Sequence, residues 1–232
     1  MRTAIVAANP KKKDALELRK KVVAFLRARG IKITPRGGTV IAVGGDGTIL
    51  YNKRYYGKPF FGIGSASSYI CHATEHDWKE KLAHVVKGYK AEKRLMLASS
   101  LDGKRLPDAL NEVCVRNKEH RILYLFLTVD GKKYKFRADG VLFSTPTGST
   151  AYCYSCGGDE IEKTARAYEV VGIAPFRRTF KPHIVNENAR CHLVVESECD
   201  ADVVIDGQYV FPIKRKSRIV VWKSEKDFLF VK

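Results

Sequence analysis

The stretch TVIAVGGDGTILY at residues 39–51 decides how this chain is interpreted. Its apolar first part, residues 39–43, is typical of a buried strand, and the glycines that follow are typical of a turn into a helix. Glycines at such a turn let the backbone approach a ligand and direct N–H groups toward it, and a helix start favours phosphate. The predicted phosphate loop comprises Gly44, Gly45, Asp46, Gly47 and Thr48.

Within this loop, Asp46 is the residue with catalytic potential. A carboxylate held beside bound phosphates can orient a metal ion or accept a proton from an attacking hydroxyl. The alternative is an ordinary glycine-rich turn in which Asp46 only caps the helix. The loop therefore needs support from other parts of the chain.

Strand and helix patterns alternate around the loop over the first third of the chain. Residues 3–8 and 60–63 have the composition of strands, and residues 14–29 carry apolar side chains at helical spacing. A further helix is expected to begin with Thr74 as its cap and to run to about Lys87. This alternation predicts a parallel sheet with flanking helices.

The pattern changes after about residue 93. Short alternating or apolar stretches follow one another, and turn dipeptides such as Asp-Gly at 130–131 and 206–207 separate them. We therefore expect an α/β domain over residues 1–93 and a β-rich domain over residues 94–222. The boundary is marked only by this change of pattern.

The composition bounds the class of protein. A net charge of +17, from 42 Lys and Arg against 25 Asp and Glu, predicts attraction to polyanions. The basic residues are dispersed and no nucleic-acid-binding motif accompanies them, so nucleotides or polyphosphate are favoured over nucleic acid. No apolar stretch approaches the ~20 residues that span a bilayer, and the first residues lack a signal-peptide pattern. We expect a cytoplasmic protein without membrane contact.

The six cysteines do not form a disulfide framework in a chain of this length and predicted location. Cys153 and Cys156 have the C-x-x-C spacing of zinc or redox sites. A four-cysteine zinc site needs a second pair with such spacing, and Cys191 and Cys199 do not have it. Reduced, packed thiols are the favoured interpretation, and no metal ligands are assigned.

Two further segments carry chemistry. Residues 139–152, DGVLFSTPTGSTAY, run from a strand into a loop of hydroxyls and glycine whose N–H groups suit ribose or phosphate, while Tyr152 suits stacking on a base. Plain helix capping explains the hydroxyls equally well. Asn111 and Glu112 are polar residues in an apolar strand, so if buried they require hydrogen-bond partners such as ribose hydroxyls.

Taken together, these segments resemble the NAD kinases, which phosphorylate the adenosine 2′-hydroxyl of NAD. The family's GGDGT loop corresponds to residues 44–48, its Asn-Glu pair to Asn111 and Glu112, and its STPTGSTAY stretch to residues 144–152. The Asp-Gly-Gln at 206–208 is a lesser match. The matches occur in family order and extend over nearly the whole chain.

The resemblance implies a role for each matching residue. Asp46 is expected to act as the general base or orienting carboxylate, with Gly47 beside the dinucleotide. Arg121 or His120 is a further candidate contact. The residues expected to bind NAD are Gly47, Asn111, Glu112, Arg137, Asp139, Thr150, Ala151, Tyr152, Ser155 and Gln208.

The resemblance also implies the fold and the partners. It implies an NAD kinase-like fold of an α/β and a β-rich domain, with the last strand, within residues 223–232, returning to the first domain. ATP or inorganic polyphosphate would donate the phosphoryl group, with Mg²⁺ as the divalent metal. A homo-oligomer, dimer or tetramer, is expected, and a neighbouring subunit can contribute to the NAD site.

One segment departs from the family pattern. Where the family carries G-I-N-x-G-x-L-G-F-L, residues 62–71 read GIGSASSYIC. Two alternatives stay open. The shared loop also fits another kinase with a GGDGT loop, acting on a lipid or small molecule, but the Asn-Glu pair and the STPTGSTAY stretch argue against it. The altered segment and the high positive charge also fit a non-catalytic nucleotide-binding protein, but the retained Asp46 argues against it.

Overall fold

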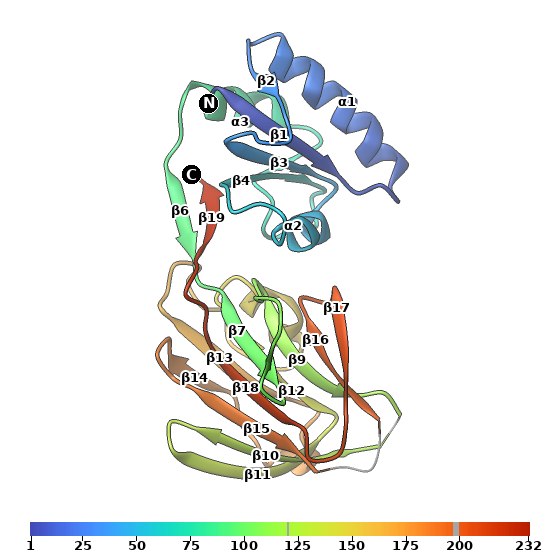
Figure 1. The fold of residues 1–232 in the computed structure, drawn as a ribbon, viewed down its shortest axis with the longest axis vertical. Helices are drawn as coiled ribbons and strands as arrows, with labels where there is room; N and C mark the ends of the chain where they lie inside the picture. The colour runs from blue at the N-terminus through green and yellow to red at the C-terminus, as the bar shows by residue number, and fades with distance from the viewer. Residues whose placement is uncertain (120, 197–199) are drawn as a thin grey trace. The chain divides into compact units, whose positions relative to one another are not determined.

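The computed structural model describes residues 1–119, 121–196 and 200–232, so His120 and Cys199 lie outside the described residues. The chain divides into two compact units (Figure 1). The first unit contains residues 1–93 and 228–232, and the second contains residues 94–227. The prediction of an α/β part followed by a β-rich part is confirmed.

The first unit is a mostly parallel sheet with helices. Its elements are β1 (Thr3–Ala8), α1 (Lys13–Arg27), β2 (Lys32–Ile33), β3 (Thr39–Val43), α2 (Asp46–Asn52), β4 (Phe60–Gly64), β5 (Ala73–Thr74), α3 (Trp78–Lys87), β6 (Ala91–Arg94) and β19 (Phe228–Val231). The strand order is β2-β1-β3-β4-β19-β6, with β5 also paired to β4. Every residue of β3 and β4 is buried, as the continuous apolar runs predict for central parallel strands.

The C-terminal strand β19 belongs to this first sheet. It pairs in parallel with β4, with Phe230 opposite Phe60, and the rings of Phe60 and Phe228 lie 4.9 Å apart. Lys90 and Lys232 exchange two backbone hydrogen bonds beside it. The last residues of the chain therefore complete the sheet that the first residues begin.

The start of α3 differs from the sequence expectation. Thr74 ends β5, and Asp77 is the residue before the helix. The Asp77 carboxylate accepts hydrogen bonds from the backbone N–H of Thr74, at 2.6 Å, and from its hydroxyl, at 3.0 Å. Thr74 is thus a hydrogen-bond donor in the turn, and its assignment as helix cap is wrong.

The second unit consists of two antiparallel sheets. Its elements are β7 (Leu97–Leu101), β8 (Lys104–Arg105), β9 (Glu112–Asn117), β10 (Leu123–Val129), β11 (Lys132–Ala138), β12 (Gly140–Ser144), η1 (Ser149–Cys153), β13 (Ala167–Ile173), η2 (Phe176–Arg178), β14 (His183–Asn186), β15 (Cys191–Val195), β16 (Ala201–Ile205), β17 (Tyr209–Ile213) and β18 (Arg218–Lys223). One sheet has the order β11-β10-β15-β18-β7-β8 and the other β14-β13-β12-β9-β16-β17.

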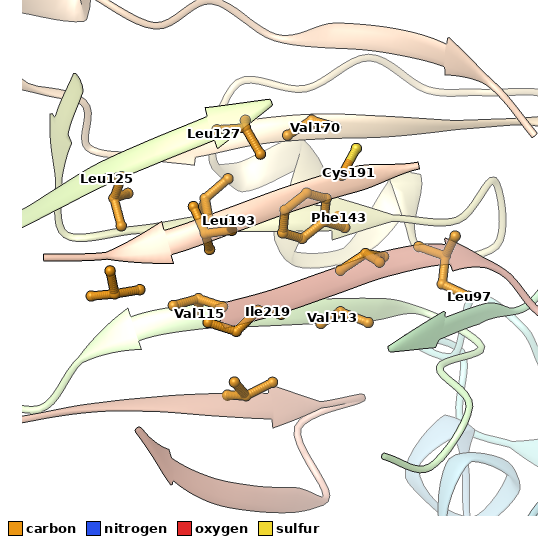
Figure 2. Packing of buried hydrophobic residues seen from close by; sticks show 14 of the residues in the cluster. Leu97, Val113, Val115, Leu125, Leu127, Phe143, Val170, Cys191, Leu193 and Ile219 are labelled. Carbon is orange, nitrogen blue, oxygen red and sulfur yellow. The ribbon is translucent and has the colours of Figure 1, made fainter. Parts of the chain in front are cut away.

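The two sheets share one hydrophobic core. Figure 2 shows side chains from both sheets meeting between them, among them Leu125 and Leu193 from one sheet and Val115 and Phe143 from the other. Period-2 alternation places their neighbours on the opposite face. On that outer face of the β9–β12–β13 sheet, Cys153 of η1 packs against the strands. The η1 segment is thereby fixed at the end of β12.

No helix among the described residues is both long and apolar enough to cross a membrane.

Candidate functional site

The GGDGT loop leaves β3 through two glycines with left-handed backbone. Gly44 has φ +125° and Gly45 has φ +94°, a region that side chains other than glycine rarely adopt. A Cβ atom on Gly44 would also lie 2.9 Å from Thr48 Oγ1. The N–H groups of both glycines donate to the carbonyl of Ile63, at 2.9 and 3.2 Å. These amides therefore hold the loop to β4, in contrast to the expectation that they point toward a ligand.

Asp46 is the first residue of α2, and its carboxylate is held from one side. The backbone N–H of Tyr69 donates to Oδ2 at 2.8 Å, and that of Ile70 donates to Oδ1 at 3.2 Å. The thiol of Cys71 lies next to the same carboxylate: burial, together with the charge of Asp46, raises the pKa of Cys71. Each Asp46 oxygen thus keeps acceptor capacity for a ligand hydroxyl.

A cavity of about 900 Å³ opens beside Asp46 within the first unit. It is bounded by the loop, by the first half of α1 and by residues 75–79. Its lining combines cations (Lys12, Lys21, Lys79), hydroxyls (Ser65, Ser67, Ser68) and carboxylates (Asp14, Glu17, Asp46, Glu75). Ammonium and hydroxyl groups are donors for phosphate oxygens, and carboxylates are ligands for hard divalent cations.

In the second unit, Asn111 and Glu112 stand at the start of β9. The Asp206 carboxylate accepts hydrogen bonds from the backbone N–H groups of Leu110, Asn111 and Glu112, the shortest being 2.8 Å. The N–H of Asp206 in turn donates to the Glu112 carbonyl at 3.0 Å. The turn between β16 and β17 therefore fixes the backbone of the Asn-Glu pair.

The turn at residues 145–148 fixes the same backbone from the other side. The N–H of Thr145 donates to the Asn111 carbonyl at 2.9 Å, and the Thr145 hydroxyl donates to the carbonyl of Leu110. Gly148 lies so close that an added Cβ atom would be 2.2 Å from the Asn111 carbonyl oxygen. The two segments that suggested a ribose site from sequence are thus in direct contact.

The polar side chains of this region are poorly solvated. Burial, reinforced by the charge of Asp206, raises the pKa of Glu112 to about 8, so its carboxyl is mostly protonated at neutral pH. Among the described residues, Asn111 Oδ1 and Thr147 Oγ1 are buried without a hydrogen-bond partner. Such atoms carry a desolvation cost of about 1–3 kcal/mol, which a bound ligand that supplies partners would relieve.

The η1 segment carries the next group of predicted residues. Thr150, Ala151 and Tyr152 are half-buried and Ser155 is exposed. The backbone at Ala151, with φ −100° and ψ −126°, interrupts the helical turn. Below it, the Cys153 thiol donates to the buried Glu169 carboxylate at 3.2 Å, which anchors the segment to β13.

The structure separates Arg137 and Asp139 from this group. Gly140 pairs with Arg116 and Ser144 pairs with Glu112, so the Asp139 end of β12 lies about 13 Å along the sheet from the Glu112 end. Asp139 is exposed, and the Arg137 guanidinium lies 4.2 Å from the ring centre of Phe176. Gln208 is exposed in the turn that begins with Asp206.

Known proteins provide an independent comparison. A family model described as the ATP-NAD kinase C-terminal domain matches residues 110–232. The chain is 34% identical over 200 residues to an NAD kinase from Methanoculleus marisnigri, covering 84% of this chain and 74% of that protein. The chain belongs to the NAD kinase family.

Further relatives agree with this membership. An NAD kinase from Methanothermobacter thermautotrophicus is 30% identical, with 94% of this chain and 87% of that protein covered. The crystal structure of an Archaeoglobus fulgidus NAD kinase in complex with ATP superimposes with a TM-score of 0.85 at 27% identity, covering 100% of this chain and 94% of that one. A yeast NADH kinase complexed with NADH has the same fold, with a TM-score of 0.85 at 18% identity, covering 100% of this chain and 83% of that one.

Two positions in this NAD kinase fold had no role in the sequence interpretation. Asp206 appeared only as part of a short Asp-Gly-Gln match, and Thr145 only as part of a longer motif. Both act through the backbone of residues 110–112. The Asp-Gly turn signal at 206–207 located the hairpin, but nothing in the local sequence relates it to a segment about 95 residues earlier.

Proposed function

We propose that this protein transfers the γ-phosphoryl group of ATP to the 2′-hydroxyl of the adenosine ribose of NAD and so forms NADP. The observation that carries this proposal is the contact between the Asn111–Glu112 backbone and the 145–148 turn, because it unites two segments by which the chain resembles NAD kinases. Family membership supports the reaction, and the ATP bound to the Archaeoglobus fulgidus NAD kinase supports the donor.

In this proposal Asp46 orients the acceptor hydroxyl. The ribose O2′ attacks the γ-phosphorus, the bond from that phosphorus to the β–γ bridging oxygen breaks, ADP leaves, and the proton of the 2′-hydroxyl passes to the Asp46 carboxylate. Phosphoryl transfer depends mainly on positioning and charge neutralisation, so the two backbone N–H groups that hold Asp46 matter as much as its basicity.

The cavity beside Asp46 is the proposed donor site. Lys12, Lys79 and the hydroxyls of Ser65, Ser67 and Ser68 would bind the phosphates there. Mg²⁺ bound mainly to the donor phosphates would neutralise their negative charge, and a carboxylate of the lining, such as Asp14 or Glu75, would suit it as a single protein ligand. Among the described residues no group of three or more His, Cys, Asp or Glu side chains is placed to hold a metal ion.

The NAD-binding residues are likewise a proposal. Asn111 and Glu112 would contact the riboses and adenine, Gly47 would lie beside the dinucleotide, and Thr150, Ala151, Tyr152, Ser155 and Gln208 would line the pocket. Asp139 precedes the end of β12 that lies about 13 Å along the sheet from Glu112, and Arg137 belongs to β11 of the other sheet. Both are kept as proposed NAD contacts, and a neighbouring subunit can contribute to the NAD site. The proposal thus includes a dimer or tetramer, and it places the protein in the cytoplasm.

A coupled assay for NADP formation tests the function directly. The assay is run with ATP, with inorganic polyphosphate and with each donor omitted; NADP formed with ATP supports the proposal. Absence of NADP with both donors would favour a non-catalytic nucleotide-binding protein. Phosphorylation of a lipid or another small hydroxyl compound in place of NAD would favour the other class of GGDGT kinase.

The Asp46→Asn substitution tests the role of the carboxylate. We expect turnover to fall by about 10³-fold or more while NAD binding, measured by calorimetry, stays within about twofold, because the amide cannot accept the proton. Normal turnover in this variant would exclude Asp46 as an essential base or orienting group.

A further inference from the structure

The turn between β16 and β17 contains a buried carboxylate that accepts hydrogen bonds from one distant segment. We propose that Asp206 is a positioning residue for NAD, which sets the backbone of Asn111 and Glu112 so that their side chains meet the dinucleotide. This inference rests on the proposed function and adds to it a residue that does not itself touch the substrate.

The geometry of the contact carries the argument. Asp206 Oδ1 accepts the N–H groups of Leu110, Asn111 and Glu112 at 3.0, 2.8 and 3.2 Å, and Oδ2 accepts that of Leu110 at 3.0 Å. Three successive N–H groups converging on one anion form a backbone nest. Asp206 is 3% exposed, so water competes little for these charge-assisted bonds.

The local backbone of Asp206 is adapted to this contact. Asp206 has φ +51° and Gly207 has φ +62°, both in the left-handed region that a tight hairpin turn requires. Asp and Asn tolerate this region better than most residues. The N–H of Asp206 also returns a hydrogen bond to the Glu112 carbonyl. Hydrogen bonds therefore run both from the Asn-Glu segment to the turn and from the turn to the Asn-Glu segment.

The opposite side of the segment is already occupied by protein. The carbonyls of Leu110 and Asn111 accept hydrogen bonds from Thr145, and Gly148 packs against Asn111 without space for a Cβ atom. The backbone of residues 110–112 is thus clamped between two turns. Only the side chains of Asn111 and Glu112 are left to bind a ligand, and their direction follows from the clamp.

Three variants test this proposal in the full-length protein. Asp206→Gly removes the carboxylate without backbone strain, because glycine accepts φ +51°. Asp206→Asn keeps one acceptor oxygen and the left-handed preference, so it should rescue part of the loss. Asp202→Asn is the matched control, since Asp202 is a buried carboxylate in β16, the strand that leads into this turn, and pairs with Lys118 at 3.0 Å.

We expect Asp206→Gly to raise the KM for NAD by about tenfold or more while the KM for ATP stays within about twofold. The KM for NAD of Asp206→Asn should lie between that of Asp206→Gly and that of the wild type, and the KM for NAD of Asp202→Asn should equal the wild-type value. Hydrogen exchange should become faster in the peptide that contains residues 110–112 of Asp206→Gly. Calorimetric titration with NAD provides the same comparison without turnover.

Several outcomes would overturn the inference. An unchanged KM for NAD in Asp206→Gly would do so, as would equal increases in the KM values for NAD and ATP, or an equal loss in Asp202→Asn. If Asp206→Gly does not fold, the KM for NAD of Asp206→Asn is the deciding measurement. If neither variant folds, Asp206 is required for folding and the inference that it positions NAD is wrong. In each case NADP formation by the wild-type protein tests the proposed function separately.

Discussion

The contact between Gly148 and Asn111 allows the proposed NAD site to be perturbed by a single methyl group. In Gly148→Ala the added Cβ would lie 2.2 Å from the Asn111 carbonyl oxygen, 2.6 Å from its carbonyl carbon and 2.7 Å from its Cα. All three atoms are backbone, so no flexible side chain can yield. One of the two segments must therefore move by roughly 1 Å.

The expected magnitude follows from that displacement. Overpacking of this kind costs about 2 kcal/mol of unfolding free energy, which for a chain of this size lowers the melting temperature by about 5 °C. A shift of roughly 1 Å in the residues that hold a substrate lowers turnover by about 100-fold. We therefore expect kcat/KM for NAD to fall about 100-fold in a protein that remains folded.

The assay is NADP formation coupled to an NADP-specific dehydrogenase, together with thermal unfolding followed by circular dichroism. Gly57→Ala is the matched control, because no atom lies within 4 Å of a Cβ added there. The control should keep the wild-type activity and melting temperature. A folded Gly148→Ala protein with wild-type kcat/KM would refute the reasoning that this contact positions the NAD site.

Two other predictions concern pH and metal. The pKa of Glu112 is raised to about 8 from its usual 4.5, so between these two pH values the native state holds a proton that the unfolded chain releases. The contribution of Glu112 to the stability of the native state is therefore full below pH ~4.5 and is lost as the pH rises toward 8. Its contribution to the unfolding free energy should fall by about 1.4 kcal/mol per pH unit across this interval, and denaturant titrations of Glu112→Gln should lack that slope. Chelation with EDTA should abolish NADP formation without lowering the melting temperature, and added Mg²⁺ should restore it; full activity in EDTA would contradict the proposed metal.

The elements that the sequence predicted well are those whose formation depends on neighbouring residues in the chain. The strand, loop and helix at residues 39–52 follow from an apolar run, two glycines and a helix start, and the structure contains all three. The start of α3 was harder to locate, because Thr74 and Asp77 are both capping residue types. In the structure the Asp77 carboxylate accepts hydrogen bonds from Thr74, and Asp77 precedes the helix; the sequence alone does not display these contacts.

The arrangement of the proposed site depends on pairing that a single sequence does not display. Arg137 and Asp139 are close in sequence to the 144–152 motif, so a linear interpretation groups them with it. In the structure β12 is extended, and its five residues carry the two ends of the segment apart. The convergence of Asp206 on Asn111 is the opposite case, in which 95 residues of chain separate two groups that are hydrogen-bonded.

Residues 62–71, where the chain departs from the family pattern, still support the Asp46 carboxylate. They supply the two groups that hold Asp46, the N–H of Tyr69 and the N–H of Ile70. Backbone donors are provided by every residue type except proline, so the altered side chains leave this function intact. A Cβ atom on Gly64 would lie 2.2 Å from the Ser68 hydroxyl oxygen and 2.8 Å from the Ser68 Cβ, so a larger residue at position 64 would displace Ser68. The departure therefore changes the side chains that line the proposed donor cavity and preserves the backbone hydrogen bonds to the Asp46 carboxylate beside it.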